Sequence, residues 1–186
     1  MSISLKLRKH LEQNKIKYEI VPHKKVYTAL DAAATLKARL EEIAKSLVVK
    51  ADKTYYLLIL SANRNVNLGK LKSILKAKKV LIPKEAELVK VFKIKPGSLT
   101  GFGSIHQLPV VVDKGFEKVR QAIFAGGSLV ESVKMNVKDY IKIEQPIRHL
   151  FSEVKKIPST WLRTGKKTIK QGIKKTKKQR SKKTRG

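Results

Sequence analysis

The sequence contains no cysteine, few aromatic residues and few acidic ones. The absence of cysteine excludes disulfides, thiolate nucleophiles and thiolate metal ligands. Aromatic residues make up only 6% of the chain, and no apolar run reaches the ~18 residues of a membrane span. Residues 1–15 follow a helical period without the apolar centre of a signal peptide. These absences predict a soluble, cytoplasmic protein.

Basic residues are abundant instead. The 43 Lys and Arg residues against 14 Asp and Glu give a formal charge of +29. Such an excess favours a polyanionic partner, with nucleic acid as the first candidate. Hydrophobic residues still account for 41% of the 186 residues. The chain can therefore form one globular domain of ordinary size with an appendage.

The charge is concentrated at the C-terminus. Residues 163–186 contain twelve Lys or Arg residues, no acidic residue and only two large apolar ones, Ile169 and Ile173. A segment of this kind cannot bury a core. We therefore divide the chain into a domain at 1–150 and a lysine-rich, largely disordered extension at 151–186. The residues predicted to contact RNA phosphates are Lys166, Lys167, Lys170, Lys174, Lys175, Lys177, Lys178 and Arg180.

Short helical and strand patterns alternate along the domain. The periodicity predicts helices over 4–14, 28–36, 67–75 and 84–91, a helical turn over 41–44, and a last helix from residue 145 into the extension. It predicts strands over 17–21, 46–50, 55–61, 80–82, 108–112 and 130–135, with a further short segment at 122–124. Thr28 is the expected N-cap of its helix. The alternation predicts an α+β (mixed α/β) fold, with a central mixed sheet flanked by short helices.

The strongest candidate site is the stretch 93–113, KIKPGSLTGFGSIHQLPVVVD. Its glycines, Gly97, Gly101 and Gly103, allow another molecule to approach the main-chain N–H groups closely. An apolar strand that ends at Asp113 follows directly. On composition alone, a ligand site and a turn that merely needs glycines are equally good interpretations.

Several common sites are excluded by their missing patterns. The four histidines are far apart in sequence without metal-ligand spacing, so we expect no metal site. The chain has neither a GxSxG elbow nor a phosphate-binding or dinucleotide-binding glycine fingerprint. No cofactor is therefore expected.

Five segments in order resemble one family. They are YEIVPHKKVYTALDAAATL (18–36), EEIAKSLVVK (41–50), YYLLILSANRNVNLGKLKSIL (55–75), KPGSLTGFGSIHQLPVVVDKGF (95–116) and FAGGSLVESVKMNVKDYIKI (124–143). Together they resemble the YbaK/prolyl-tRNA synthetase-associated domain, over about residues 3–143. Members of that family are free-standing or synthetase-appended deacylases that edit mischarged aminoacyl-tRNA. The resemblance implies a trans-editing hydrolase whose partners are aminoacyl-tRNA and either the ribosome or a synthetase.

The resemblance also implies catalytic roles. Lys45 stands where the family keeps a functional lysine, which can hold the terminal adenosine or its phosphate. Its alternative interpretation is a solvated lysine at a helix–strand junction. Gly101 and Gly103, with Gly97, match the glycine loop whose N–H groups can stabilise the oxyanion as water attacks the ester.

A second group matches the family's substrate pocket. Two members have a structural alternative, Thr28 as a helix cap and Asp113 as a strand-end cap or ion-pair partner. For His106, which lies in the same loop, an exposed loop histidine is the preferred interpretation. The predicted substrate-binding residues are Tyr27, Thr28, Gly97, Ser104, Asp113, Gly126 and Ser128.

Two departures from the family leave a second function open. Many relatives have a proline in the loop where this chain has Gly101 or Ile105. Some have a histidine where it has Ser128, which cannot act as a base near neutral pH. The alternative is a catalytically weakened module that binds tRNA or ribosomal RNA through its basic tail. A tail bound to an anionic membrane is less favoured, because the tail lacks Trp, Phe and Leu for insertion.

We predict that deleting residues 163–186 weakens RNA binding at low salt and leaves the fold intact, since the lost contacts are to phosphates. RNA titrations and thermal unfolding of the two proteins test this. A collapse in thermal stability would show that the tail is structural.

Overall fold

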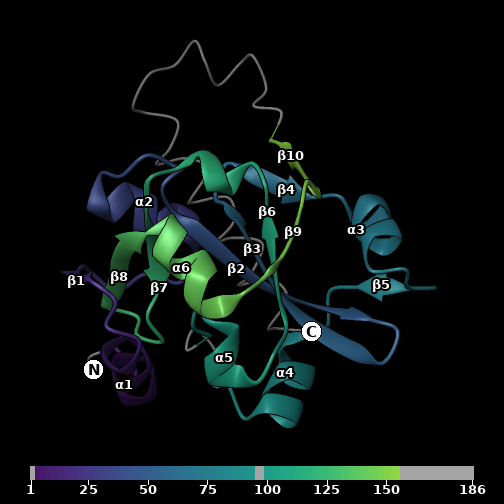
Figure 1. Cartoon of the computed structure of the whole chain (residues 1–186), viewed down its shortest axis with the longest axis horizontal. Helices are drawn as coiled ribbons and strands as arrows, with labels where there is room; N and C mark the ends of the chain where they lie inside the picture. The colour runs from purple at the N-terminus through teal and green to yellow at the C-terminus, as the bar shows by residue number, and fades with distance from the viewer. Residues whose placement is uncertain (1–2, 95–98, 156–186) are drawn as a thin grey trace, which may run out of the picture. The chain divides into compact units, whose positions relative to one another are not determined.

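A computed structural model of the chain describes residues 3–94 and 99–155. The predicted RNA-binding residues between Lys166 and Arg180, together with Gly97, lie outside the described residues. The described part has a mixed α/β architecture with a central mixed sheet (Figure 1). This architecture confirms the predicted fold class.

The elements are short and closely spaced along the chain. The helices are α1 (Leu5–Gln13), α2 (Ala29–Leu36), α3 (Leu68–Ile74), α4 (Glu85–Phe92), α5 (Gly103–His106) and α6 (Val137–Glu144), with a 3-10 helix η1 (Phe116–Lys118). The strands are β1 (Tyr18–Pro22), β2 (Ala44–Ala51), β3 (Thr54–Ser61), β4 (Arg64–Val66), β5 (Val80–Leu81), β6 (Val110–Asp113), β7 (Gln121–Ala125), β8 (Glu131–Asn136), β9 (Ile147–His149) and β10 (Ser152–Val154).

The central sheet has the strand order β5-β2-β3-β6-β9. Its β5-β2 and β2-β3 pairs are antiparallel, whereas β3-β6 and β6-β9 are parallel. A second, antiparallel sheet has the order β1-β8-β7. It meets the start of β2 through a parallel bridge between Ile43 and Ile123. Strands β4 and β10 form a separate antiparallel pair.

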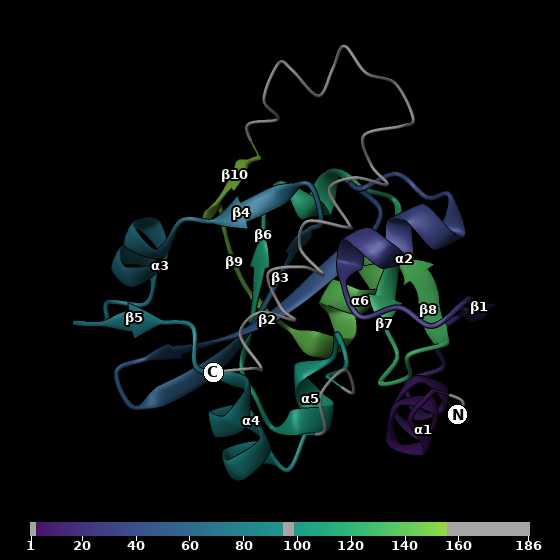
Figure 2. The ribbon, with the colours of Figure 1, turned by 180° about the vertical axis from the view of Figure 1, so that it is seen from behind.

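The core lies on both faces of β3. Leu57 and Ile59 pack into one cluster with residues of α1 and α6, and Leu58 and Leu60 pack into another with Leu71 of α3. A third cluster places α2 over the junction of the two sheets. Figures 1 and 2 show α6 and α2 in front of the sheet from opposite sides. The body therefore consists of sheets covered by helices on both faces.

Most predicted elements are confirmed with small shifts at their ends. Thr28 caps α2 as expected, because its Oγ1 accepts a hydrogen bond from the Asp31 N–H at 3.1 Å. The sequence did not predict β4, the single turn of helix α5 or helix α6. The helical turn expected over 41–44 is wrong, because Ile43 forms a β-bridge and Ala44 begins β2. The last helix expected from residue 145 is wrong, since this segment forms β9 and β10. Both strands are short and pair with strands distant in sequence, which the local pattern could not reveal.

Asp113 anchors that C-terminal segment to the sheet. Its side chain is fully buried and its Oδ2 accepts hydrogen bonds from the N–H groups of Phe151 and Ser152, at 3.0 and 2.8 Å. Its Oδ1 accepts from the Gly115 N–H and lies 3.5 Å from Arg64 Nε. These contacts match the alternative role given for Asp113, a strand-end cap or ion-pair partner, rather than a contact with substrate.

We predict that Asp113→Ala lowers the free energy of unfolding by about 3–5 kcal/mol, because it leaves the N–H groups of Phe151 and Ser152 without their acceptor and removes the ion-pair partner of Arg64. Chemical denaturation measures this loss. Glu153→Ala is the control, since this exposed carboxylate pairs with Lys70 and its removal is expected to cost less than about 1 kcal/mol. Equal losses in the two variants would contradict the anchoring role.

Candidate functional site

The glycine loop and the AGG turn after β7 lie against each other. The Gly101 N–H donates to the Ala125 carbonyl at 2.9 Å, and Thr100 and Gly126 form an antiparallel bridge. Gly127 has a φ of 77°, which favours glycine at this turn. The structure thus brings together two segments that the sequence separates by more than twenty residues.

Close packing explains the glycines at 101 and 103. A Cβ atom on Gly101 would lie 3.3 Å from Phe124 and from Ser46 Oγ. A Cβ atom on Gly103 would lie only 2.3 Å from the Leu108 carbonyl oxygen and from a methyl group of Val110. Any larger residue at 103 would therefore force the backbone apart.

Three N–H groups of the loop already have acceptors within the chain, whereas the Gly103 N–H has none among the described residues. The Thr100 N–H donates to His106 Nε2, the Gly101 N–H to Ala125, and the Ser104 N–H to Glu144. This corrects the expectation that the Gly101 N–H is available to an oxyanion. Gly97, the third glycine of that expectation, lies outside the described residues.

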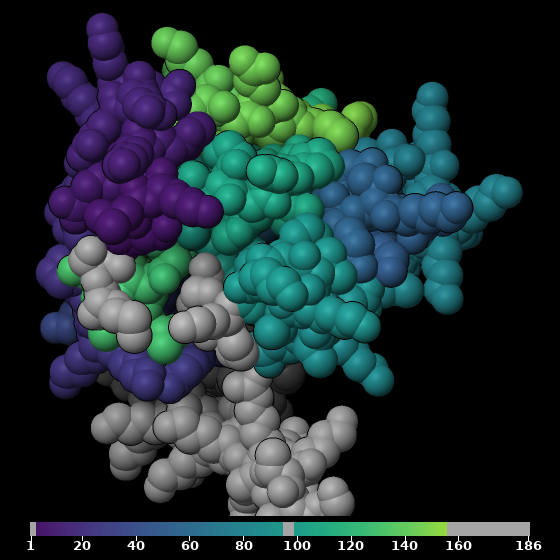
Figure 3. All heavy atoms as spheres, turned by 90° about the horizontal axis from the view of Figure 1, so that it is seen from below, coloured from purple at the N-terminus to yellow at the C-terminus, as the bar shows by residue number. Residues whose placement is uncertain are grey.

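Helix α6 holds the loop from two sides. The buried Tyr140 hydroxyl donates to the Gly101 carbonyl at 2.8 Å, and burial raises its pKa well above the usual value. One turn later, Glu144 accepts from the Ser104 N–H at 3.0 Å and from its hydroxyl at 2.6 Å. His10 of α1 lies 3.4 Å from the same carboxylate. Figure 3 shows α1, in purple, beside the teal and green surface of α5 and α6.

These contacts give Ser104 a structural partner. Its hydroxyl and its N–H both bind Glu144, whose side chain is only 1% exposed. The structure therefore places Ser104 in a link between α5 and α6. For Ser104 to contact substrate as predicted, its hydrogen bonds to Glu144 would have to break.

Lys45 lies inside β2, opposite Leu60, rather than at a helix–strand junction. The next residue, Ser46, faces the glycine loop at Gly101. Since neighbouring side chains on a strand leave from opposite faces, the Lys45 and Ser46 side chains start on opposite sides of β2.

Ser46 is a polar residue that sequence reasoning missed. Its Oγ is buried and has no hydrogen-bond partner among the described residues. A buried hydroxyl without a partner is uncommon and calls for an explanation. Its position beside Lys45 and Gly101 makes it a candidate to contact a ligand. The only sequence signal was its place next to Lys45.

Other predicted pocket residues are spread out. Tyr27 is 62% exposed, and Lys25 Nζ lies 5.3 Å from its ring centroid. Thr28, at the start of α2, has its hydroxyl engaged as the helix cap. Ser128 lies in the turn after Gly127, where its Oγ accepts from the Val130 N–H at 3.2 Å. Of this group, only Gly126 and Ser128 belong to the turn beside the loop.

A cavity of about 460 Å³ adjoins the loop. It brings Thr100 and His106 of the loop together with Gly127 of the AGG turn, and α4 contributes Val91 and Phe92. Lys6 and Lys93 supply positive charge there. None of the described residues predicted for catalysis or substrate binding lines this cavity.

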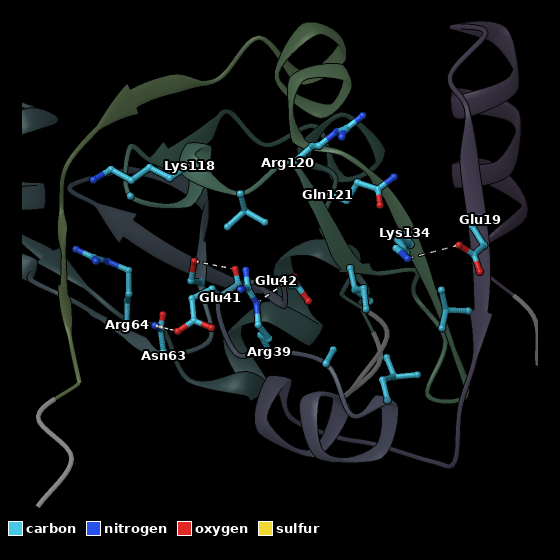
Figure 4. A pocket seen from close by; sticks show the side chains of 17 residues that line it. Glu19, Arg39, Glu41, Glu42, Asn63, Arg64, Lys118, Arg120, Gln121 and Lys134 are labelled. Atoms are coloured by element: carbon cyan, nitrogen blue, oxygen red, sulfur yellow. Dashed lines mark hydrogen bonds and ion pairs between the residues drawn. The ribbon is translucent and has the colours of Figure 1, made fainter.

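A second cavity of about 770 Å³ is lined by other residues (Figure 4). Arg39 pairs with Glu42, Asn63 with Glu41, and Lys134 with Glu19 around it. Its lining does not include Lys45, the glycine loop or the AGG turn. Several of its charges are thus already matched by neighbours.

The described ranges offer neither a metal-binding cluster nor a membrane-spanning helix. Residues 3–94 and 99–155 contain no group of three or more His, Cys, Asp or Glu side chains that could hold a metal ion. Over the same ranges, no helix is long and apolar enough to cross a membrane.

Solved structures share this fold. A hypothetical protein superposes with a TM-score of 0.72 at 17% identity, covering 80% of this chain and 99% of that one. A candidate trans-editing enzyme for prolyl-tRNA synthetase superposes with a TM-score of 0.69 at 22% identity, covering 82% and 99%. At these identities the likeness shows the fold alone. The fold class is therefore that of a mixed α/β domain shared with these proteins.

Sequence comparison then identifies the family. Residues 23–143 match the model of the aminoacyl-tRNA editing domain, and the chain belongs to this family. The proline–tRNA ligase of Macrococcus caseolyticus (strain JCSC5402) is 27% identical over 110 residues, which are 59% of this chain and 19% of the ligase. The chain thus matches about a fifth of that relative's length. The predicted family is confirmed.

His106 gives the loop a pH-dependent contact. Burial, and secondly the charge of Lys6, lowers the pKa of its imidazole below the ordinary 6.5. Its Nε2 accepts from the Thr100 N–H at 3.1 Å, which requires the neutral ring. As the pH falls below the ordinary value, the unfolded chain takes up a proton that the folded ring resists. The stability from this residue is therefore present at neutral pH and lost on acidification.

We predict that the wild type loses more stability between about pH 7.5 and about pH 5.5 than His106→Gln, because glutamine keeps an acceptor but does not titrate. Denaturant unfolding at both pH values measures the difference, and the other histidines cancel in the comparison. Equal losses in the two proteins would contradict the proposed titration of His106.

Proposed function

We propose that the chain is a trans-editing hydrolase that deacylates mischarged aminoacyl-tRNA. An aminoacyl ester is already activated, and the neighbouring ribose hydroxyl can assist the attacking water. Hydrolysis then needs positioning and electrostatic stabilisation rather than a protein nucleophile. This chemistry suits a family member without cysteine.

One observation carries the proposal. The glycine loop, the AGG turn and the Ser46 hydroxyl converge on one side of β2, and Lys45, the preceding residue, starts on the other side of the strand. In the proposed mechanism, Lys45 binds the terminal adenosine or its phosphate. Gly103 and Gly97 are the remaining predicted sources of an oxyanion N–H. The match of residues 23–143 to the aminoacyl-tRNA editing domain family supports the same class of reaction.

The proposed partners follow from this reaction. Aminoacyl-tRNA is the substrate, and the match to a proline–tRNA ligase supports a synthetase as a second partner. The basic tail is proposed to hold RNA phosphates without reading sequence.

A second function has specific support. The Gly101 N–H is occupied by Ala125, and Ser104 is held by Glu144, so two predicted site residues are engaged. This arrangement favours a weakly active or inactive module that binds tRNA or ribosomal RNA. The two functions differ in whether the ester is cleaved.

We predict that the protein hydrolyses at least one of Ala-, Cys- and Ser-charged tRNA, and that Lys45→Ala slows this on the order of 100-fold, because substrate positioning is lost. Loss of labelled amino acid from each charged tRNA over time is the measurement.

Lys9→Ala, on the exposed side of α1, is the matched control for the loss of one positive charge. Hydrolysis of none of the three charged tRNAs would favour the binding module. Hydrolysis at equal rates by the wild type and Lys45→Ala would exclude the proposed role of Lys45 but not the deacylase activity itself.

A further inference from the structure

A group of lysines projects from the end of the central sheet opposite to Lys45. Residues 69–84, from α3 to the residue before α4, contain six lysines and no acidic residue. Figures 1 and 2 show α3, β5 and the β2–β3 hairpin turn gathered at this end. We call this region the lysine arm. Its exposed members are Lys53, Lys70, Lys72, Lys76, Lys78, Lys79 and Lys84.

Asp52 fixes the arm's geometry. Its carboxylate accepts hydrogen bonds from the N–H groups of Lys78 and Lys79, at 3.0 and 2.8 Å. Its own N–H donates to the Lys79 carbonyl at 2.9 Å. These bonds, which lower the pKa of Asp52, fasten the segment before β5 onto the hairpin turn. The ammonium groups of Lys53, Lys78 and Lys79 are therefore attached to one ordered surface.

Three of the acidic groups near the arm have partners of their own, while Glu85, the exposed first residue of α4, directly follows the arm. The Asp52 carboxylate is bound by main-chain N–H groups. Glu87 of α4 accepts from Lys50 Nζ at 3.0 Å and from the Tyr55 hydroxyl at 2.5 Å. Glu153 pairs with Lys70 at 3.4 Å. Positive charge is therefore left in excess on Lys53, Lys72, Lys76, Lys78 and Lys79.

Strand β2 sets the distance from the arm to the candidate site. Lys45 lies near the start of β2, and Ala51, next to the hairpin turn, ends it. Six residues of strand at about 3.3 Å each span roughly 20 Å. A group bound at the arm is thus well separated from a nucleotide end held at Lys45.

We propose that the lysine arm binds the phosphate backbone of a duplex RNA whose 3′ end occupies the candidate site. Lysine ammonium groups are compact charges that suit phosphates and read no base sequence. The separation of roughly 20 Å places the contact on the stem that carries the 3′ end rather than on the terminal nucleotide. This inference rests on the proposed function for the choice of RNA as partner, and it assigns the arm a share of binding apart from the basic tail.

The test compares two variants of the full chain with the same loss of charge. The arm variant is Lys72→Ala, Lys76→Ala, Lys78→Ala and Lys79→Ala. The control variant is Lys9→Ala, Lys15→Ala, Lys17→Ala and Lys24→Ala, which also removes four exposed lysines. Each set includes one residue with a left-handed backbone, Lys76 and Lys15. Circular dichroism and thermal unfolding check that both variants fold.

The probe is an uncharged hairpin RNA with the stem and single-stranded 3′ end of a tRNA acceptor arm. We expect the arm variant to bind it about tenfold or more weakly at moderate salt, with a salt slope smaller by about 2–3, because each lost phosphate contact removes about 0.7–0.9 from the slope. The affinity of the control variant is expected to stay within about twofold of that of the wild type. Its lost charges lie outside the contact, and salt screens their interaction with the RNA. A CCA trinucleotide, too short to reach the arm, is expected to bind all three proteins equally.

Each other outcome overturns the inference. Equal weakening by the two variants would mean that net charge alone matters, and unchanged binding by the arm variant would mean that the arm makes no RNA contact. Arm-dependent binding to phosphatidylserine vesicles without arm-dependent RNA binding would assign the arm to a membrane. Because the probe RNA carries no amino acid, failure of the deacylation assay would leave an arm-dependent RNA contact standing, so the two proposals can fail separately.

Discussion

Strand β3 has no exposed face between Leu57 and Leu60, and the rest of the domain is arranged around this constraint. All four residues from Leu57 to Leu60 are fully buried. Leu57 and Ile59 require cover on one side, and Leu58 and Leu60 on the other. Helices α1 and α6 supply the first cover, while α3 and the segment around Phe151 supply the second. Strands β2 and β6 bind its two edges.

The candidate site lies where this covering layer meets the second sheet. Tyr140 packs in the core against Phe124, with ring centroids 4.4 Å apart, and its hydroxyl reaches the Gly101 carbonyl. The same helix ends at Glu144, which holds Ser104. The loop is thus fixed by α6 on one side and by β7 on the other. Rigid support of this kind is what a positioning site requires, although it occupies some of the N–H groups that the sequence offered for catalysis.

Much of the architecture follows from local patterns in the sequence. Apolar periodicity identified helices α1 to α4 and the β2–β3 hairpin, because each of these elements shows its own buried face. Thr28 was predicted as the α2 cap from residue type and spacing alone. The segment after residue 145 was mistaken for a helix, since β9 and β10 depend on β6, β4 and the Asp113 carboxylate for their conformation. Helix α5 was missed because it comprises a single turn held by Glu144.

By itself, the sequence determined the family and the fold class, and it marked the segments proposed to form the site. Composition, glycine spacing and the order of five segments are local properties of the chain, so they could be read without coordinates. Only the tertiary structure decided which atoms remain available. The Gly101 N–H donates to the Ala125 carbonyl and the Ser104 hydroxyl donates to the Glu144 carboxylate. The Ser46 hydroxyl has no hydrogen-bond partner among the described residues. Hydrogen bonds between residues 24 to 40 positions apart depend on the packing of whole elements, and no local pattern encodes that packing.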